Sequence, residues 1–279
     1  MIQRLRRRTQ RPEPEIRRLS VPAEPAAAYL DLLKRALCDL LATETETAVA
    51  QPDGSVVVER LKDLSRRENG DDWPQRGTTM VGLRRLDQLQ SCVETVVRDG
   101  TPGDMIETGV WRGGASILMR ATLHALGDAD RNVWLADSFE GLPPARPDKY
   151  PADAGADVLS TYGFLAVSED EVRGAFERYG LLDQRVRFLR GWFSDTLPPL
   201  RGRHTWSVLR LDGDHYESTI VALESLYPDL SPGGFVVVDD YGAIAQCRQA
   251  VDDFRQANGI EEPLHEIDWT GVWWRRPVS

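Results

Sequence analysis

The sequence is poor in cysteine and histidine. Its three cysteines, Cys38, Cys92 and Cys247, are far apart and none has a CxxC spacing, so we expect neither a disulfide framework nor a zinc site. Four histidines leave little room for a His-rich metal centre. At 279 residues and 41% hydrophobic content, the chain can form a core that needs no cross-link.

The sequence also lacks a segment that would enter a membrane. No apolar run approaches the roughly 18 residues of a spanning helix, and the basic start, 4-RLRRR-8, has no signal-peptide stretch after it. The formal charge of −10 argues against nucleic acid or an anionic membrane as the main partner. We therefore expect a cytoplasmic protein whose residues 1–25 form a disordered basic tail.

Two amphipathic helices are predicted ahead of the main domain. Residues 26–44 place four leucines on one helical face, at Leu30, Leu33, Leu37 and Leu41. Residues 77–100 repeat leucine and valine at helical spacing and end at Gly100. A polar, partly strand-like stretch separates them, to about Gly70. We predict that residues 26–100 form an N-terminal helical or cap region.

From residue 104 short apolar runs alternate with helical stretches, which predicts an α/β fold with a mostly parallel sheet covered by helices on both faces. The expected strands are 104–109, 132–138, 185–191, 206–214 and 233–241, and the expected helices are 114–126, 169–179, 216–227 and 244–257. Residues 264–276 read as two strands joined by a Thr-Gly turn, an antiparallel edge. The core then covers residues 101–279, with a Pro/Gly/Asp-rich lid loop at 140–165.

The stretch 106-IETGVWRGGASI-117 lies where a cofactor turn is expected. It is not a dinucleotide fingerprint, because the first glycine spacing is wrong and Glu107 would face the phosphates without a counterion. A cofactor with positive charge reverses that argument. S-adenosylmethionine (SAM) carries a sulfonium and an ammonium, so we favour SAM over a nicotinamide cofactor or a purely structural turn.

Two further strand ends suit the same cofactor. Asp137 with Ser138 ends the second strand, where an acidic residue can accept hydrogen bonds from ribose hydroxyls. The third strand ends in 191-GWFSD-195, whose aromatic side chains can border an adenine. Together these positions extend the predicted SAM site along one edge of the sheet.

Carboxylates also end the two remaining strands of the predicted core. Asp212, with Asp214, follows one strand, and Asp239 and Asp240 follow the next. Because the carboxyl ends of parallel strands share one edge, these groups repel one another unless a cation joins them. Each could instead cap the following helix. Beside a SAM-like turn we favour Mg²⁺, which prefers oxygen ligands.

SAM and a metal together predict methyl transfer to a hydroxyl. A divalent ion on the hydroxyl oxygen stabilises the developing alkoxide, a carboxylate takes the proton, and attack on the methyl group then needs mainly positioning. We choose Asp212 as metal ligand and as the base. Asp214 and His215 are the alternatives for the base.

Several runs of sequence resemble the macrocin O-methyltransferase (TylF-type) family, which includes sugar O-methyltransferases of the mycinamicin and novobiocin pathways. The matching runs are ETGVWRGGA, VWLADSFEGLP, RYGLLD, VRFLRGWFSDTLP, LRLDGDHY and LSPGGFVVVDDY. The resemblance covers roughly residues 27–276. It implies a class I SAM methyltransferase fold and Mg²⁺-dependent methylation of a deoxysugar hydroxyl on a secondary metabolite such as a glycosylated antibiotic.

Carried over residue by residue, the resemblance implies a site and an assembly. The metal ligands would be Asp212, Asp239 and Asp240, with Asp212 also the base. The SAM contacts would be Thr79, Met80, Glu107, Thr108, Gly109, Val110, Trp111, Gly113, Asp137, Ser138 and Trp192. Homo-oligomers, dimers or tetramers, are also implied. A catechol or other phenol is the alternative acceptor; a metal-dependent hydrolase and a SAM-binding protein without catalysis are less favoured.

Overall fold

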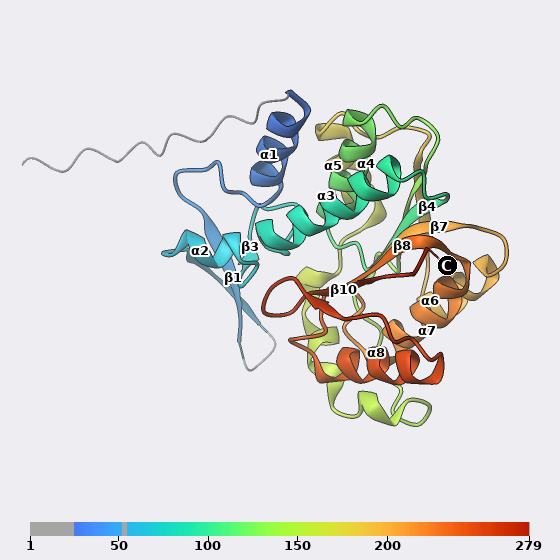
Figure 1. The fold of residues 1–279 in the computed structure, drawn as a ribbon. Helices are drawn as coiled ribbons and strands as arrows, with labels where there is room; N and C mark the ends of the chain where they lie inside the picture. Colours follow the sequence, from blue (N-terminus) through green and yellow to red (C-terminus); the bar gives the residue numbers. More distant parts are fainter. Residues whose placement is uncertain (1–24, 52–54, 279) are drawn as a thin grey trace, which may run out of the picture.

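The computed structural model describes residues 25–51 and 55–278 (Figure 1). The basic tail expected at residues 1–25 therefore lies almost wholly outside the described residues. Among the helices that the structure describes, none is both long and apolar enough to cross a membrane.

A seven-stranded sheet forms the centre of the molecule, with the strand order β6-β5-β4-β7-β8-β10-β9. Strands β4 to β8 are parallel, whereas β10 pairs antiparallel with both β8 and β9. The predicted parallel sheet and antiparallel edge are thus confirmed. Their bounds are β4 Asp104–Thr108, β5 Val133–Asp137, β6 Val186–Arg190, β7 Trp206–Leu211, β8 Leu230–Val238, β9 His265–Glu266 and β10 Val272–Arg275.

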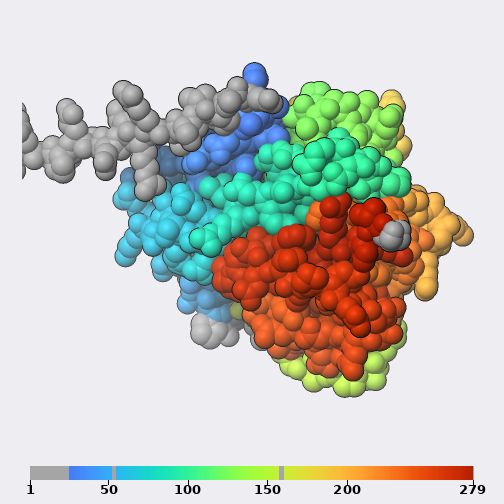
Figure 2. All heavy atoms as spheres, viewed as in Figure 1, coloured from blue at the N-terminus to red at the C-terminus, as the bar shows by residue number. Residues whose placement is uncertain are grey.

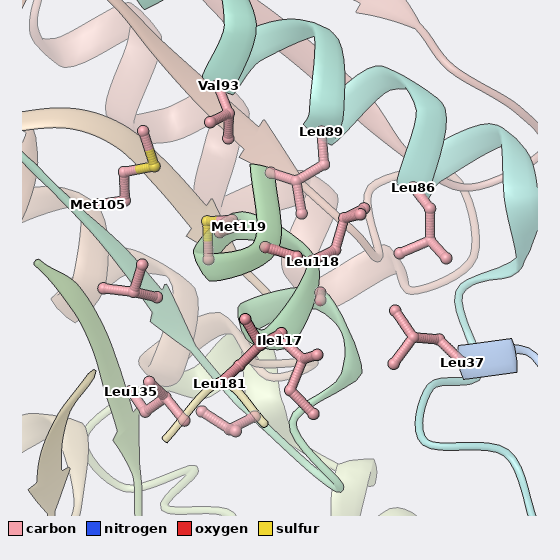
Figure 3. Packing of buried hydrophobic residues seen from close by; sticks show 14 of the residues in the cluster. Leu37, Leu86, Leu89, Val93, Met105, Ile117, Leu118, Met119, Leu135 and Leu181 are labelled. Atoms are coloured by element: carbon pink, nitrogen blue, oxygen red, sulfur yellow. The ribbon is translucent and has the colours of Figure 1, made fainter. Parts of the chain in front are cut away.

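Helices cover both faces of this sheet because its strands are apolar on both sides. Along β8, Phe235 and Val237 belong to one hydrophobic cluster, while Val236 and Val238 belong to the other. The first cluster includes leucines and valines of the helices on its face (Figure 3). The helices are α3 Gly82–Arg98, α4 Gly114–Ala125, α5 Glu169–Arg178, α6 Phe193–Thr196, α7 Tyr216–Leu226 and α8 Ala245–Ala257, with short 3-10 helices at Pro198–Leu200 and Tyr227–Asp229.

The N-terminal region differs in part from the helical prediction. Its first helix, α1 (Pro25–Leu37), is shorter than expected, because Asp39 has a φ of 54°, a left-handed conformation that cannot continue an α-helix. Leu41 consequently leaves the predicted apolar face and is 56% exposed. The region also contains a three-stranded antiparallel sheet in the order β2-β1-β3. Its elements are β1 Glu46–Ala50, β2 Val56–Arg60, α2 Leu64–Glu68 and β3 Trp73–Pro74.

The segment expected to be an irregular loop contains three 3-10 helices, Pro151–Asp153, Ala156–Thr161 and Gly163–Leu165. It is fastened to the start of α7. The buried carboxylate of Asp153 accepts the backbone N–H groups of Tyr216 (2.7 Å) and Glu217 (3.0 Å), at the positive end of that helix. Arg146 also forms an ion pair with Glu217. The segment therefore rests on the core rather than extending into solvent.

Candidate active site

A cavity of about 590 Å³ opens at the carboxyl ends of the parallel strands. This is the edge at which parallel α/β sheets bind ligands. Its wall is completed by two outlying parts of the chain: the N-terminal region contributes Trp73 and Thr79, and the turn between β9 and β10 contributes Trp269. The cavity is therefore shared by the sheet, the N-terminal region and the C-terminal hairpin.

The turn after β4 approaches the neighbouring strand too closely for a side chain. Gly109 has a φ of +85°, and a Cβ added there would lie 1.6 Å from the carbonyl oxygen of Asp212. The Asp137 carboxylate, at the end of β5, accepts the backbone N–H groups of Val110 and Phe139, each at 2.7 Å. Only glycine fits at Gly109, and Asp137 fixes the turn from the next strand.

Arg112, in the turn after β4, holds the segment between β3 and α3. Its Nη1 atom donates to the carbonyl oxygens of Pro74 (3.0 Å), Gln75 (3.0 Å) and Gly77 (2.9 Å). Its guanidinium carbon also lies 4.2 Å from the centre of the Trp111 ring. These hydrogen bonds hold the N-terminal segment against the turn after β4, where the cofactor is expected.

The start of α4 receives the same segment. The N–H of Gly114 donates to the carbonyl of Thr78 at 3.0 Å, and a Cβ at Gly114 would lie 2.6 Å from that of Thr79. This close contact between the segment and the start of α4 brings Thr79 and Met80 into the cavity wall. On the other side, the Trp111 indole donates to the carbonyl of Phe164 at 3.2 Å, which ties the 140–165 segment to the turn.

Arg210, the next-to-last residue of β7, is buried among three carboxylates. Its Nη1 donates to Glu107 at 2.7 Å and to Asp212 at 2.9 Å, and its Nη2 donates to Asp239 at 2.6 Å. The side chain is only 3% exposed, so these charges are desolvated and depend on one another. Burial raises the pKa of Glu107 to about 7 although Arg210 and Ser116 oppose the shift. Glu107 thus faces the cavity as one member of a paired network.

Arg85, on α3, links three parts of the chain. It forms an ion pair with Asp239, donates to Asp268 at 2.9 Å, and donates to the Gly70 carbonyl at 3.0 Å. Figure 2 shows the C-terminal residues, in red, lying directly against the N-terminal part of the molecule. Arg85 therefore fixes the N-terminal region and the C-terminal hairpin to the acidic edge of the sheet.

Asp212, Asp239 and Asp240 converge as the strand-end argument predicted. One carboxylate oxygen from each lies within 4.8 Å of the others. Burial, followed by repulsion from Asp239, raises the pKa of Asp212 to about 6, and burial with repulsion from Asp212 raises that of Asp214 to about 8. Burial also raises the pKa of Asp240. A set of oxygen donors that repel one another fits a divalent cation such as Mg²⁺.

The structure separates the predicted site residues into those that line the cavity and those that do not. Thr108 and Gly113 lie outside its wall: Thr108 follows Glu107 on β4 and points to the opposite face, and Gly113 faces Val172 and Phe176 of α5. His215, the alternative base, is buried at the start of α7 and is also outside the wall. The predicted residues that do line it are Thr79, Met80, Glu107, Gly109, Val110, Trp111, Asp137, Ser138, Trp192, Asp212, Asp239 and Asp240, together with the alternative base Asp214.

The cavity wall also contains charged and aromatic side chains that were not predicted as site residues, among them Arg85, Arg146, Arg210 and Trp269. Arg210 could have been predicted from the sequence, because an arginine inside a mostly apolar central strand needs buried acidic partners. Arg85 and Trp269 could not, because their segments have the sequence pattern of an ordinary helix and an ordinary hairpin.

Comparison with known proteins gives one consistent result. A family model described as Macrocin-O-methyltransferase (TylF) matches residues 26–276. The chain is 54% identical to 8-demethyl-8-(2,3-dimethoxy-alpha-L-rhamnosyl)-tetracenomycin-C 4'-O-methyltransferase of Streptomyces olivaceus, covering 90% of this chain and 93% of the relative. It is 45% identical to mycinamicin III 3''-O-methyltransferase of Micromonospora griseorubida, covering 91% and 98%.

The fold is also that of a solved relative. The structure of the O-methyltransferase NovP superposes with a TM-score of 0.82 at 44% identity, covering 90% of this chain and 99% of that chain. The calicheamicin methyltransferase CalS11 shares the fold at 18% identity, with a TM-score of 0.57 and coverage of 88% and 91%.

Proposed function

The chain belongs to the macrocin O-methyltransferase (TylF) family and is an O-methyltransferase, and we propose that it transfers a methyl group from SAM to a sugar hydroxyl of a glycosylated natural product. The observation that carries the proposal is the acidic group of Asp212, Asp239 and Asp240 in the same cavity as the glycine turn. The relatives named above, which methylate sugars, support a glycoside as acceptor.

SAM would lie along the turn after β4. The Asp137 Oδ2 atom accepts the N–H of Val110 and has a second lone pair that can accept a ribose hydroxyl. The Oδ1 atom already accepts the N–H of Phe139 and, at 3.4 Å, the Ser138 hydroxyl. Trp192 lines the cavity after β6, where an adenine would need an apolar neighbour. The buried cluster carries more carboxylates than guanidinium groups, which favours a cationic methyl donor.

Asp212, Asp239 and Asp240 would hold Mg²⁺, which when bound lowers the pKa of a coordinated hydroxyl and stabilises the developing alkoxide. Arg210 and Arg85 keep the Asp239 carboxylate in place through both of its oxygens. Asp212 accepts the proton of the acceptor hydroxyl while the hydroxyl oxygen bonds to the methyl carbon and the carbon–sulfur bond breaks. Asp214 lines the same wall and is the alternative base.

The test of the proposal is methyl transfer by the purified protein from SAM to 8-demethyl-8-(2,3-dimethoxy-α-L-rhamnosyl)-tetracenomycin C and to mycinamicin III, followed by mass spectrometry. We expect methylation of at least one glycoside, its loss in EDTA and its return with excess Mg²⁺. Full activity in EDTA contradicts the metal role. Methylation of catechol with neither glycoside methylated contradicts the sugar assignment.

We propose that the described chain divides into a cap at residues 26–100 and a methyltransferase core from 101 onward with a lid at 140–165, and that copies associate through the cap. Six large apolar side chains are exposed between residues 29 and 64: Tyr29, Leu32, Leu41, Val57, Val58 and Leu64. Such a concentration favours an interface. Light scattering on the eluting protein should give the mass of a dimer or tetramer, and a monomer mass at micromolar concentration contradicts the assembly.

A further inference from the structure

Trp269 is an exposed aromatic side chain in the cavity wall. It is 53% exposed, although tryptophan usually buries most of its surface, and it lies in the turn between β9 and β10. In Figure 1 this turn, drawn in red beside β10, extends toward the N-terminal region. A single exposed apolar residue on an outer surface would need no explanation, but one beside the acidic residues does.

The turn that carries Trp269 is held rigidly. One Asp268 oxygen accepts the N–H groups of Thr270 (3.0 Å) and Gly271 (2.8 Å), and the other accepts the Nε of Arg85 at 2.9 Å. Both carboxylate oxygens are therefore used to fix the turn. A side chain held in this way loses little further entropy when a ligand binds against it.

The same turn is attached to the strand end that carries the acidic residues. The Thr270 hydroxyl donates to the carbonyl of Asp239 at 2.9 Å, and the N–H of Gly242 donates to the carbonyl of Thr270 at 2.7 Å. A Cβ at Gly242 would lie 2.3 Å from the Trp269 carbonyl oxygen, so the two segments are in close backbone contact. The position of Trp269 relative to Asp239 and Asp240 is thus fixed by the fold.

The indole of Trp269 has no polar group left to offer a ligand. Its only donor, Nε1, already bonds to the carbonyl of Asn69 at 3.1 Å. The Arg85 guanidinium carbon lies over the ring, 6.0 Å from its centre, and the remaining surface that the ring presents to the cavity is apolar. A pyranose has a complementary shape, because the C–H bonds of one ring face are apolar while its hydroxyls point outward. A ring stacked on this surface would lie in the same cavity as the acidic residues.

We infer that Trp269 is the platform on which the acceptor sugar stacks, and hence a specificity-determining residue for the hydroxyl that is methylated. The inference rests on the proposed function. The methyl donor is not the occupant of this surface, because the features that suit SAM, Asp137 and Trp192, belong to β5 and the loop after β6. The turn that carries Trp269 is bonded instead to Asp239, which follows β8, and to Arg85 of α3.

Three substitutions separate a stacking platform from a structural side chain. Trp269→Phe keeps an aromatic face and loses the bond to Asn69, Trp269→Leu keeps apolar volume without an aromatic face, and Trp269→Ala removes both. With the rhamnosyl tetracenomycin as probe, we expect Trp269→Ala and Trp269→Leu to raise the acceptor KM about tenfold, which is about 1.4 kcal/mol, and Trp269→Phe to stay within about threefold. The Kd of SAM by calorimetry should stay within about twofold in all three.

Leu126→Ala, an exposed apolar residue after α4, is the matched control and should leave both constants unchanged. An unchanged acceptor KM in Trp269→Ala overturns the platform, and so does equal rescue by Leu and Phe, since that result means packing without stacking. A parallel loss of SAM affinity also overturns it. If the enzyme without substitutions methylates neither glycoside, both the proposed function and the platform are wrong. If it methylates a glycoside and Trp269→Ala has the same acceptor KM, only the platform is wrong.

Discussion

Replacing Asp212 with asparagine is expected to lower kcat for methyl transfer by about 10³-fold, within the range of lost general-base catalysis. Asparagine keeps the shape of the side chain but removes a charge from the group of three carboxylates and cannot accept the proton. SAM should still bind with nearly unchanged affinity, because the turn after β4 and Asp137 are untouched. Single-turnover kinetics with calorimetry of SAM binding measure the two effects separately.

The metal role of Asp212 can also be tested without an activity assay, by measuring how Mg²⁺ changes Tm. In the unchanged enzyme Mg²⁺ should raise Tm, and more at pH 8 than at pH 6. The pKa values of Asp212 (about 6) and Asp214 (about 8) lie above their ordinary value, so the cation-free fold loses stability as pH rises from about 4 to 8, and at pH 6 the cation must displace protons. Asp212→Asn should lose most of this Mg²⁺-dependent rise.

Asp214→Asn is the informative control for the choice of base. Asp214 lines the same wall but lies outside the set of three carboxylates. If Asp212 is the base, Asp214→Asn should retain more than about a tenth of the activity, far above the loss typical of a removed base. Unchanged turnover in Asp212→Asn excludes Asp212 from the reaction. A loss confined to Asp214→Asn assigns the base to Asp214.

Arg210→Met should destabilise the protein by about 3–5 kcal/mol, the usual effect of removing one partner of a buried ion pair. Methionine approximates the volume of the side chain but leaves Glu107, Asp212 and Asp239 without their shared counterion. Urea denaturation followed by circular dichroism gives the difference in the free energy of unfolding. Mg²⁺ should restore part of the loss, since a divalent cation supplies positive charge beside the same carboxylates.

Arg98→Met is the matched control, because Arg98 is 69% exposed and, among the residues that the structure describes, forms an ion pair only with the neighbouring Asp99. Its effect on the free energy of unfolding should be under about 1 kcal/mol, as for surface pairs. Equal stability of Arg210→Met and Arg98→Met would mean that the buried network does not stabilise the fold. If Mg²⁺ changes the free energy of unfolding by the same amount in both variants, Arg210 and the cation do not act on the same carboxylates.

The order of strands and helices in the core could be predicted from the sequence because each element has an apolar period and a clear stop. The meeting of Asp212 with Asp239 and Asp240 followed from the same reasoning, since parallel strands end at one edge. The limit of α1 could not be predicted, because Leu41 continues the leucine spacing and the left-handed φ of Asp39 leaves no trace in the apolar pattern.

The contacts that assemble the site from distant segments were also beyond sequence reasoning. The bonds from Arg85 to Asp239 and Asp268 join residues 154 and 183 positions apart, and neither spacing has a sequence signature. Glu107 shows a related difficulty: it was correctly placed at the cavity, but its pairing with Arg210 depends on strand register, which sets β4 beside β7 with Glu107 opposite Arg210.

Arg112 recognises the N-terminal segment through the carbonyl oxygens of Pro74, Gln75 and Gly77, and not through any of their side chains. Because Arg112 bonds only to main-chain oxygens here, these bonds depend on the backbone path of the segment and not on its side chains. The side chains of this segment can therefore change while the cofactor turn stays the same. For protein engineering, an N-terminal region grafted from a relative should dock where Arg112, the backbone path at residues 74–77 and the pairing of Arg85 with Asp239 and Asp268 are all kept.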